Sequence, residues 1–153
     1  NGLYEDTVIV AYADHYLYTL NDKSILDKYK NTSNNLINHT PFFIWSSDTD
    51  AENIDKATMQ TNILPTVLNL FGIEYNPNVY IGKDALAEDY DGCIFFSDYS
   101  WYDGNIYVEN GHITNGGEAD QEYIEYISEK IGTVVRKNDL TLRYNYFKKK
   151  NKK

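Results

Sequence analysis

The pattern of hydrophobic and polar residues predicts two strands near the start of the chain. Residues 7–13 form a continuous apolar and β-branched run, which is typical of a strand covered on both faces in a parallel sheet. Residues 41–45 form a second buried strand, with Pro41 at the first position, where no ladder hydrogen bond is needed. Between these strands the sequence predicts a short helix over 23–30 and a polar surface loop over 31–40.

A longer helix is predicted in the middle of the chain. Residues 58–71 place apolar side chains on one helical face, and Gly72 is positioned to cap the helix. Pro65 lies inside this stretch, so we expect either a kink there or a helix whose true first turn contains Pro65. The apolar face consists of Ile63, Leu64, Val67, Leu68 and Phe71.

The rest of the chain reads as short β segments followed by a helix. The Asp103-Gly104 and Asn110-Gly111 pairs separate alternating segments, which is a strong signal for β-hairpins. Residues 118–136 carry apolar residues at helical spacing, and residues 138–150 fit either a strand or a short helix. The predicted fold class is therefore α/β: a sheet with flanking helices, then an antiparallel β meander and a helix, in one compact unit.

Composition and charge narrow the classes of partner. A chain of 153 residues suits one domain, and its formal charge of -9 argues against a nucleic-acid partner. The exception is the basic run Lys148–Lys153, which fits either an anionic surface or a solvated terminus. The single cysteine, Cys93, excludes an intrachain disulfide and precedes an apolar run, so we expect it to be a buried spectator.

The start of the sequence carries its own signal. Gly2 and the turn after it fit the end of a helix that would precede residue 1. We therefore expect the chain to be a piece of something longer. The sequence shows neither a signal-peptide pattern nor an apolar run long enough to cross a bilayer.

Asp14 and His15 are the candidate metal ligands. They follow the first predicted strand, and open α/β sheets bind ligands beyond the carboxyl ends of their strands. Adjacent side chains on a regular strand point to opposite faces, so both reach one ion only if the strand breaks at Ala13 or Asp14. A carboxylate with a neutral imidazole favours Mn²⁺ or Zn²⁺ over Ca²⁺. The alternative is an aspartate that caps a loop and a histidine that happens to follow it.

Other polar candidates are weaker. His39 lies in a polar loop and His112 in a hairpin, so we expect both to be solvated. Acidic residues with the alternate spacing of a calcium loop occur at 48, 50 and 52. That interpretation fails because Asn53 stands where the loop requires glycine and Met59 where it requires a bidentate glutamate.

Six segments in order extend the interpretation to a known family. They resemble the C-terminal half of the sulfatase-like catalytic domain of lipoteichoic acid synthase, in the alkaline phosphatase superfamily. The resemblance covers residues 1–153 and implies a partial alkaline-phosphatase/sulfatase-like fold whose N-terminal half is absent. The segments are GLYEDTVIVAYADHYLYTL, HTPFFIW, TNILPTVLNLFGI, IGKDAL, FFSDYSWYDGNIYVENG and NDLTLRYNYFKKK.

The resemblance implies roles for individual residues. It makes Asp14 and His15 ligands of the catalytic metal, usually Mn²⁺, with Mg²⁺ or Zn²⁺ as other divalent candidates. It places the threonine nucleophile and a glutamate ligand in the absent half, so no catalytic residue is expected within this chain. Ala13 and Leu17 stand where the family usually has glycine, which places the sequence in an outlying branch.

The resemblance also implies a reaction and a location. The parent enzyme would attack phosphatidylglycerol, form a glycerophospho-threonine intermediate and extend a polyglycerolphosphate acceptor. It would be anchored at the extracellular face of the bacterial cell membrane through a segment absent here. We expect the isolated chain to be inactive and to self-associate through an uncovered strand edge. The alternatives are a fragment of a sulfatase or phosphoethanolamine transferase, or a non-catalytic module that binds glycan or a partner.

Overall fold

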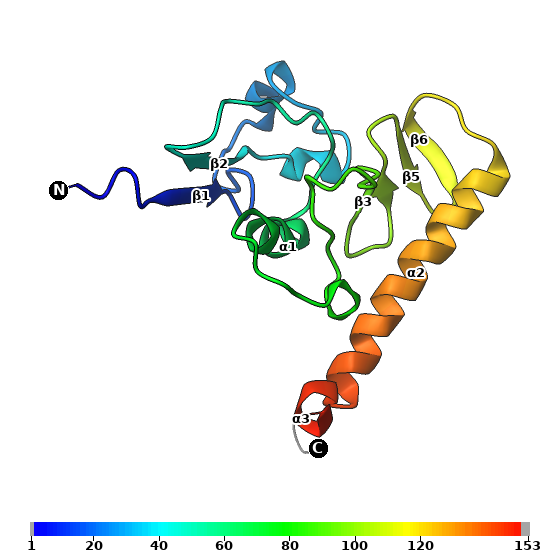
Figure 1. Ribbon diagram of the computed structural model, residues 1–153. Helices are drawn as coiled ribbons and strands as arrows, with labels where there is room; N and C mark the ends of the chain where they lie inside the picture. Colours follow the sequence, from blue (N-terminus) through cyan, green and yellow to red (C-terminus); the bar gives the residue numbers. More distant parts are fainter. Residues whose placement is uncertain (1, 151–153) are drawn as a thin grey trace. The chain divides into compact units, whose positions relative to one another are not determined.

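A computed structural model describes residues 2–150, and the chain divides into two compact units (Figure 1). The units are Asn1–Ile54 and Asp55–Lys153. The sequence predicted one compact unit, and that expectation is wrong. The boundary falls in the acidic stretch after the second strand, which the sequence identified as a loop but not as a division between units.

The first unit is built on a two-stranded antiparallel sheet. β1 pairs with β2, and Val10 lies opposite Ile44. The predicted parallel pairing is therefore wrong, because a continuous apolar run reports apolar faces and not the direction of a neighbouring strand. The elements are β1 (Val8–Tyr12), the 3₁₀ helices η1 (Lys23–Lys28) and η2 (Asn35–Asn38), and β2 (Phe42–Ser46).

Burial in the first unit also differs from the prediction. No side chain of residues 2–54 is fully buried, and Ile9, Tyr12 and Phe43 are exposed. Two strands alone have too few neighbours to cover both faces of the sheet. The two strands are therefore apolar in sequence, but they are not buried as the sequence predicted.

The second unit holds a four-stranded antiparallel meander in the order β3-β4-β5-β6. Both predicted hairpins are confirmed. Asn110 and Gly111 have φ angles of 52° and 76°, as a two-residue turn of the primed type requires. Gly104, with a φ of 96°, turns the chain between β4 and β5. The strands are β3 (Ile94–Phe95), β4 (Trp101–Tyr102), β5 (Ile106–Glu109) and β6 (His112–Gly116).

The core of the second unit joins this sheet to the long helix α2 (Gln121–Arg143) (Figure 1). The Trp101 indole donates a hydrogen bond from Nε1 to Ser128 Oγ at 3.1 Å, which satisfies its polar edge within the packed layer. The predicted helical spacing of the isoleucines is confirmed. The buried cluster comprises Trp101, Ile106, Val108, Ile124, Ile127 and Ile131.

The helix α1 (Gln60–Leu70) is present, but its buried face is not the predicted one. Leu64 and Phe71 are exposed. Pro65 lies inside the helix and beyond its first turn, and the Gly72 N–H closes the C-terminus on Asn69 O at 2.8 Å. The buried residues of α1 are Asn62, Pro65 and Thr66.

Hydrogen bonds explain why a polar face is buried. Asn62 Nδ2 donates to the Lys83 carbonyl at 2.8 Å, and the Ala85 N–H donates to Thr66 Oγ1 at 2.8 Å. These bonds attach α1 to the following segment, which includes the 3₁₀ helix η3 (Pro77–Val79). Because every buried amide and hydroxyl there has a partner, the polar face packs as well as an apolar one would.

The C-terminal region is helical, which resolves the ambiguity left by the sequence. α2 continues to Arg143, and α3 (Tyr146–Lys150) follows a turn at Asn145, whose φ is 51°. The last part of the predicted basic run, residues 151–153, lies outside the described residues. Among residues 2–150, no helix combines the length and the apolar composition that crossing a bilayer requires.

Candidate functional site

The candidate metal ligands lie directly after β1. The strand ends at Tyr12, so the chain has left the regular β conformation before Asp14, as a common ligand point requires. The Thr40 hydroxyl donates to the Ala13 carbonyl at 3.1 Å, which fixes the first residue beyond the strand. Because the strand ends before them, the side chains of Asp14 and His15 are not forced to opposite faces of the sheet.

The two side chains converge. His15 Nε2 lies 3.5 Å from Asp14 Oδ1, and the side chains are 44% and 80% exposed. Two ligand atoms bound to one ion at about 2.0–2.2 Å lie about 3.0–3.5 Å apart in octahedral or tetrahedral coordination. The observed separation fits two ligands of one divalent cation, and it fits equally an ion pair between a carboxylate and an imidazolium.

The second ring nitrogen of His15 favours a ligand role. Nδ1 lies 2.6 Å from the Tyr16 carbonyl oxygen, and a carbonyl only accepts hydrogen bonds, so Nδ1 carries the proton. In the neutral ring this leaves the Nε2 lone pair directed away from the backbone. Histidines that bind metals commonly donate their other N–H to such a carbonyl, which fixes the ring and its tautomer. Tyr18 stacks on the ring at 4.1 Å and further limits its rotation.

The described residues provide only part of a metal site. Nowhere in residues 2–150 do three or more His, Cys, Asp or Glu side chains come together as a metal-binding group would. A working zinc site takes about three protein ligands. His39 and His112 are both exposed and do not join Asp14 and His15 in any such group.

Positive charge lies beside the ring of Tyr16, the residue that follows this pair in the sequence. Lys23 Nζ is 5.4 Å from the centre of the Tyr16 ring, and Lys30 Nζ is 5.8 Å from it. Lys30 also donates to the His39 carbonyl at 2.9 Å, which holds the lysine in place. The residue after His15 is therefore flanked by two cations on a chain whose net charge is negative. The sequence alone does not identify these lysines, because their proximity to Tyr16 depends on how the intervening residues fold.

A second charged cluster lies in the second unit. Lys130 Nζ is 2.7 Å from Asp91 Oδ2, and Lys83 Nζ is 3.5 Å from the same oxygen. Burial opposes ionisation of Asp91, but hydrogen bonds from Lys130 and the Cys93 N–H, with the two lysine charges, lower its pKa below the usual range. Burial, with the nearby Asp91 charge, raises the pKa of the Cys93 thiol to about 12. Cys93 is therefore not a thiolate nucleophile at neutral pH.

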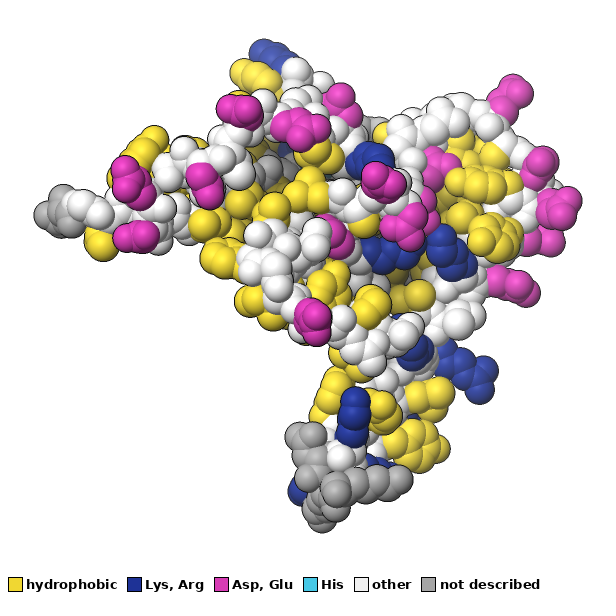
Figure 2. Space-filling model, viewed as in Figure 1, with side chains coloured by type: hydrophobic (Ala, Val, Ile, Leu, Met, Phe, Trp, Pro, Cys, Tyr) yellow, Lys and Arg dark blue, Asp and Glu magenta, His cyan; other side chains and the backbone are white. Residues whose placement is uncertain are grey.

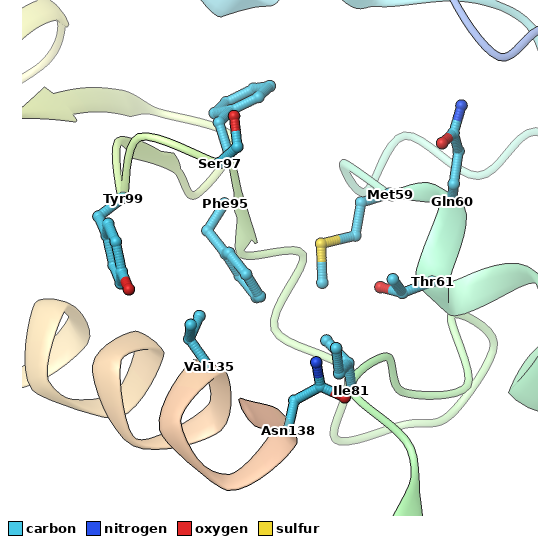
Figure 3. A pocket seen from close by; sticks show the side chains of 10 residues that line it. Met59, Gln60, Thr61, Ile81, Phe95, Ser97, Tyr99, Val135 and Asn138 are labelled. Carbon is cyan, nitrogen blue, oxygen red and sulfur yellow. The ribbon is translucent and has the colours of Figure 1, made fainter. Parts of the chain in front are cut away.

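One cavity of about 490 Å³ lies in the second unit (Figure 3). Figure 3 shows Met59, Thr61, Phe95 and Asn138 turned toward a common space, with Tyr99 on the outer side of Phe95. None of the lining side chains is ionisable at neutral pH, so the cavity lacks the groups for metal or acid–base chemistry. It is lined by Met59, Gln60, Thr61, Ile81, Phe95, Phe96, Ser97, Tyr99, Val135 and Asn138.

The first part of the chain matches a family model. The sequence model of the sulfatase family matches residues 1–73, just under half of the chain, which include Asp14 and His15. This part of the chain is similar to that family. The same match covers β1, β2 and the whole of α1, and so it supports the partial sulfatase-like α/β fold that the resemblance implied.

Curated relatives extend the similarity along the chain. Lipoteichoic acid synthase of Staphylococcus saprophyticus is 29% identical over 119 residues, which are 69% of this chain and 18% of that protein. Lipoteichoic acid synthase 2 of Bacillus subtilis is 26% identical over 145 residues, 86% of this chain and 22% of the relative. Lipoteichoic acid synthase of Staphylococcus aureus strain USA300 is 27% identical over 134 residues, 79% of this chain and 21% of the relative.

These similarities confirm the resemblance to lipoteichoic acid synthases. The chain spans about a fifth of the length of the curated relatives it matches. No solved structure matches the chain significantly.

Proposed function

We propose that this chain supplies Asp14 and His15 to the divalent-metal site of an extracellular phosphoglycerol transferase that builds polyglycerolphosphate from phosphatidylglycerol. The observation that carries the proposal is the 3.5 Å approach of His15 Nε2 to Asp14 Oδ1 in a sulfatase-like segment. Similarity to lipoteichoic acid synthases along most of the chain supports this reaction over other reactions of the sulfatase family.

The residues of the chain have separable roles in this proposal. Asp14 Oδ1 and His15 Nε2 would hold the ion, and the Tyr16 carbonyl would keep the imidazole in the tautomer that leaves Nε2 available. A divalent cation, Mn²⁺ in the first instance, would neutralise the charge of a phosphoryl group and lower the pKa of a coordinated hydroxyl. Lys23 and Lys30 would attract the phosphate of the lipid headgroup toward this point.

We further propose that the isolated chain is inactive. It contributes a carboxylate and an imidazole, and the remaining ligand and the threonine nucleophile would come from another part of a longer protein. Two ligands bind a divalent cation weakly, because each further ligand adds attraction without further loss of the ion's translational freedom. The isolated chain is therefore expected to bind Mn²⁺ weakly and to show no phosphodiester turnover.

The test uses a longer protein that carries this segment together with a threonine nucleophile. Asp14→Ala and His15→Ala are expected to abolish Mn²⁺-dependent release of diacylglycerol from phosphatidylglycerol. His39→Ala is the matched control, because His39 is exposed and belongs to no candidate ligand group, and it should keep normal turnover. Full activity of either ligand variant would refute the assignment, and hydrolysis of a sulfate ester in place of phosphatidylglycerol cleavage would favour a sulfatase.

A further inference from the structure

The charge of the chain is strongly segregated. Residues 136–153 hold eight of the 14 Lys and Arg residues but only one of the 23 Asp and Glu residues. This region therefore carries a formal charge of +7 on a protein whose total is -9. Figure 2 shows the dark blue Lys and Arg side chains beside hydrophobic ones over the end of α2 and over α3.

Residues 136–150, the described part of this region, form the basic segment. Their side chains lie outside the buried core of the second unit. The last buried residue of α2 is Ile131, and no residue from 136 to 150 is buried. Figure 1 shows this end of α2 running past the β3–β6 sheet. The sole acid of the basic segment, Asp139, is paired with Arg143 at 2.8 Å, so it does not offset the remaining positive charge.

Large apolar side chains lie exposed among these cations. Leu142 is 70% exposed and Tyr144 is 62% exposed. Lys149 Nζ lies 5.6 Å from the centre of the Tyr144 ring, so ammonium and aromatic groups occupy the same surface. The exposed apolar side chains of the basic segment are Leu140, Leu142, Tyr144, Tyr146 and Phe147.

This combination identifies the partner by its chemistry. A soluble polyanion needs only the positive charges and would leave Leu142 and Phe147 in water. A second copy of the segment would bring like charges together. A lipid surface with anionic headgroups satisfies both kinds of side chain, because lysines remain at the phosphates while leucine and aromatic side chains enter the acyl boundary.

We propose that the basic segment docks on an anionic lipid surface, with α2 and α3 lying at the headgroup level. The turn at Asn145 divides the segment into the end of α2 and the short helix α3, so that the segment is not one continuous helix. Lys148, Lys149 and Lys150 contact the headgroups, and Leu142 and Phe147 enter the apolar boundary. The docking involves neither Asp14 nor His15, so it stands or falls separately from the proposed metal site.

Vesicle co-sedimentation of the 153-residue chain tests this docking. The vesicles are phosphatidylcholine alone, or equimolar phosphatidylcholine and phosphatidylserine, with EDTA present so that no divalent metal bridges protein and lipid. We expect binding only to vesicles that contain phosphatidylserine, and weaker binding as salt increases. Absence of binding to the anionic vesicles would overturn the proposal.

Charge-reversal variants locate the surface. Replacing lysine by glutamate at positions 148, 149 and 150 together should weaken binding by about a hundredfold or more. Matched single variants avoid the lysines near the proposed metal site: Lys149→Glu should weaken binding by about fivefold or more, whereas Lys28→Glu, which changes the net charge equally within the first unit, should leave binding within about twofold. Equal loss in these two single variants would mean that net charge alone drives binding, and would overturn the proposal.

Apolar variants separate a lipid surface from a soluble polyanion. Leu142→Ser with Phe147→Ser should reduce vesicle binding by about tenfold while leaving binding of soluble polyphosphate unchanged. Unchanged vesicle binding in this double variant would show that only charge is recognised, and would contradict insertion. Circular dichroism checks the fold, which these exposed side chains are not expected to affect.

Discussion

Gly82 lies against the backbone carbonyl of Thr61, so closely that a Cβ at position 82 would overlap the carbonyl oxygen. Pro65 stands four residues after Thr61 in α1 and has no N–H to donate to that carbonyl. The Thr61 carbonyl therefore accepts no helical hydrogen bond from position 65. Gly82 packs directly against this carbonyl, which is possible because glycine has no Cβ.

Gly82→Ala is therefore expected to lower the free energy of unfolding by about 1–3 kcal/mol, because the methyl group must displace backbone atoms. Urea unfolding monitored by tryptophan fluorescence measures the change. Gly132→Ala is the matched control: it lies in α2 with open space around a Cβ. That substitution should raise the free energy of unfolding by about 0.5–1 kcal/mol. Equal effects of the two alanines would contradict the packing described for Gly82.

The Asp91–Lys130 ion pair predicts how stability depends on pH. The folded state lowers the pKa of Asp91, so the unfolded chain binds its proton more readily. The stabilisation is complete above the unfolded pKa of about 3.9 and is lost as the pH falls through the lower folded value. The raised pKa of Lys130 acts only at alkaline pH and does not enter this window.

Asp91→Asn should therefore lower stability by up to about 1 kcal/mol at pH 7 and should flatten the acid dependence of the unfolding free energy. Urea titrations at pH 7 and at successively lower pH values measure both effects. Asp89→Asn, at an exposed position nearby in the sequence, serves as the control and should leave the slope unchanged. An Asp91 variant with the acid slope of the wild type would show that another carboxylate causes it.

Tyr99 occupies a backbone conformation that suits glycine or asparagine. Its φ is 66°, and it follows a turn in which the Tyr99 N–H donates to the Phe96 carbonyl at 3.0 Å. Tyr99→Asn should raise the free energy of unfolding by about 1 kcal/mol, because a left-handed conformation costs tyrosine more than asparagine. Tyr126→Asn, at an exposed helical position, should change stability little. A loss of stability in Tyr99→Asn would mean that the ring packs against the cavity it lines.

Local signals in the sequence predicted much of the second unit. The Asn110-Gly111 pair specified its hairpin because only residues that accept positive φ fit that turn. The isoleucine spacing of α2 fixed its buried face, which packs on the meander. Both features depend on residues within a few positions of one another, which is the range over which pattern and turn chemistry act.

Features that depend on distant parts of the chain were not predictable. The direction of β2 relative to β1 is set by the path of the intervening loop, and neither strand records it. The buried face of α1 is polar because Asn62 and Thr66 find partners at Lys83 and Ala85, far along the sequence. Hydrophobic periodicity predicted that Leu64 would be buried, but Leu64 is exposed.

The candidate site also combines residues that the sequence predicted with groups that only the fold brings together. Asp14 and His15 were found from the sequence because they are adjacent and follow an apolar run. The Tyr16 carbonyl that fixes the His15 ring, and the lysines beside Tyr16, emerged only from the fold. The cavity is lined by residues from position 59 to position 138, which no local motif brings together.

The proposed function requires Asp14 and His15 to bind one divalent cation together. The most direct measurement is Mn²⁺ titration of the chain while the ring signals of its three histidines are followed by NMR, because bound Mn²⁺ broadens nearby resonances. We expect the His15 signals to broaden first, and we expect Asp14→Asn to remove this preference. Equal broadening of His15, His39 and His112, or an Asp14→Asn variant that behaves like the wild type, would contradict it.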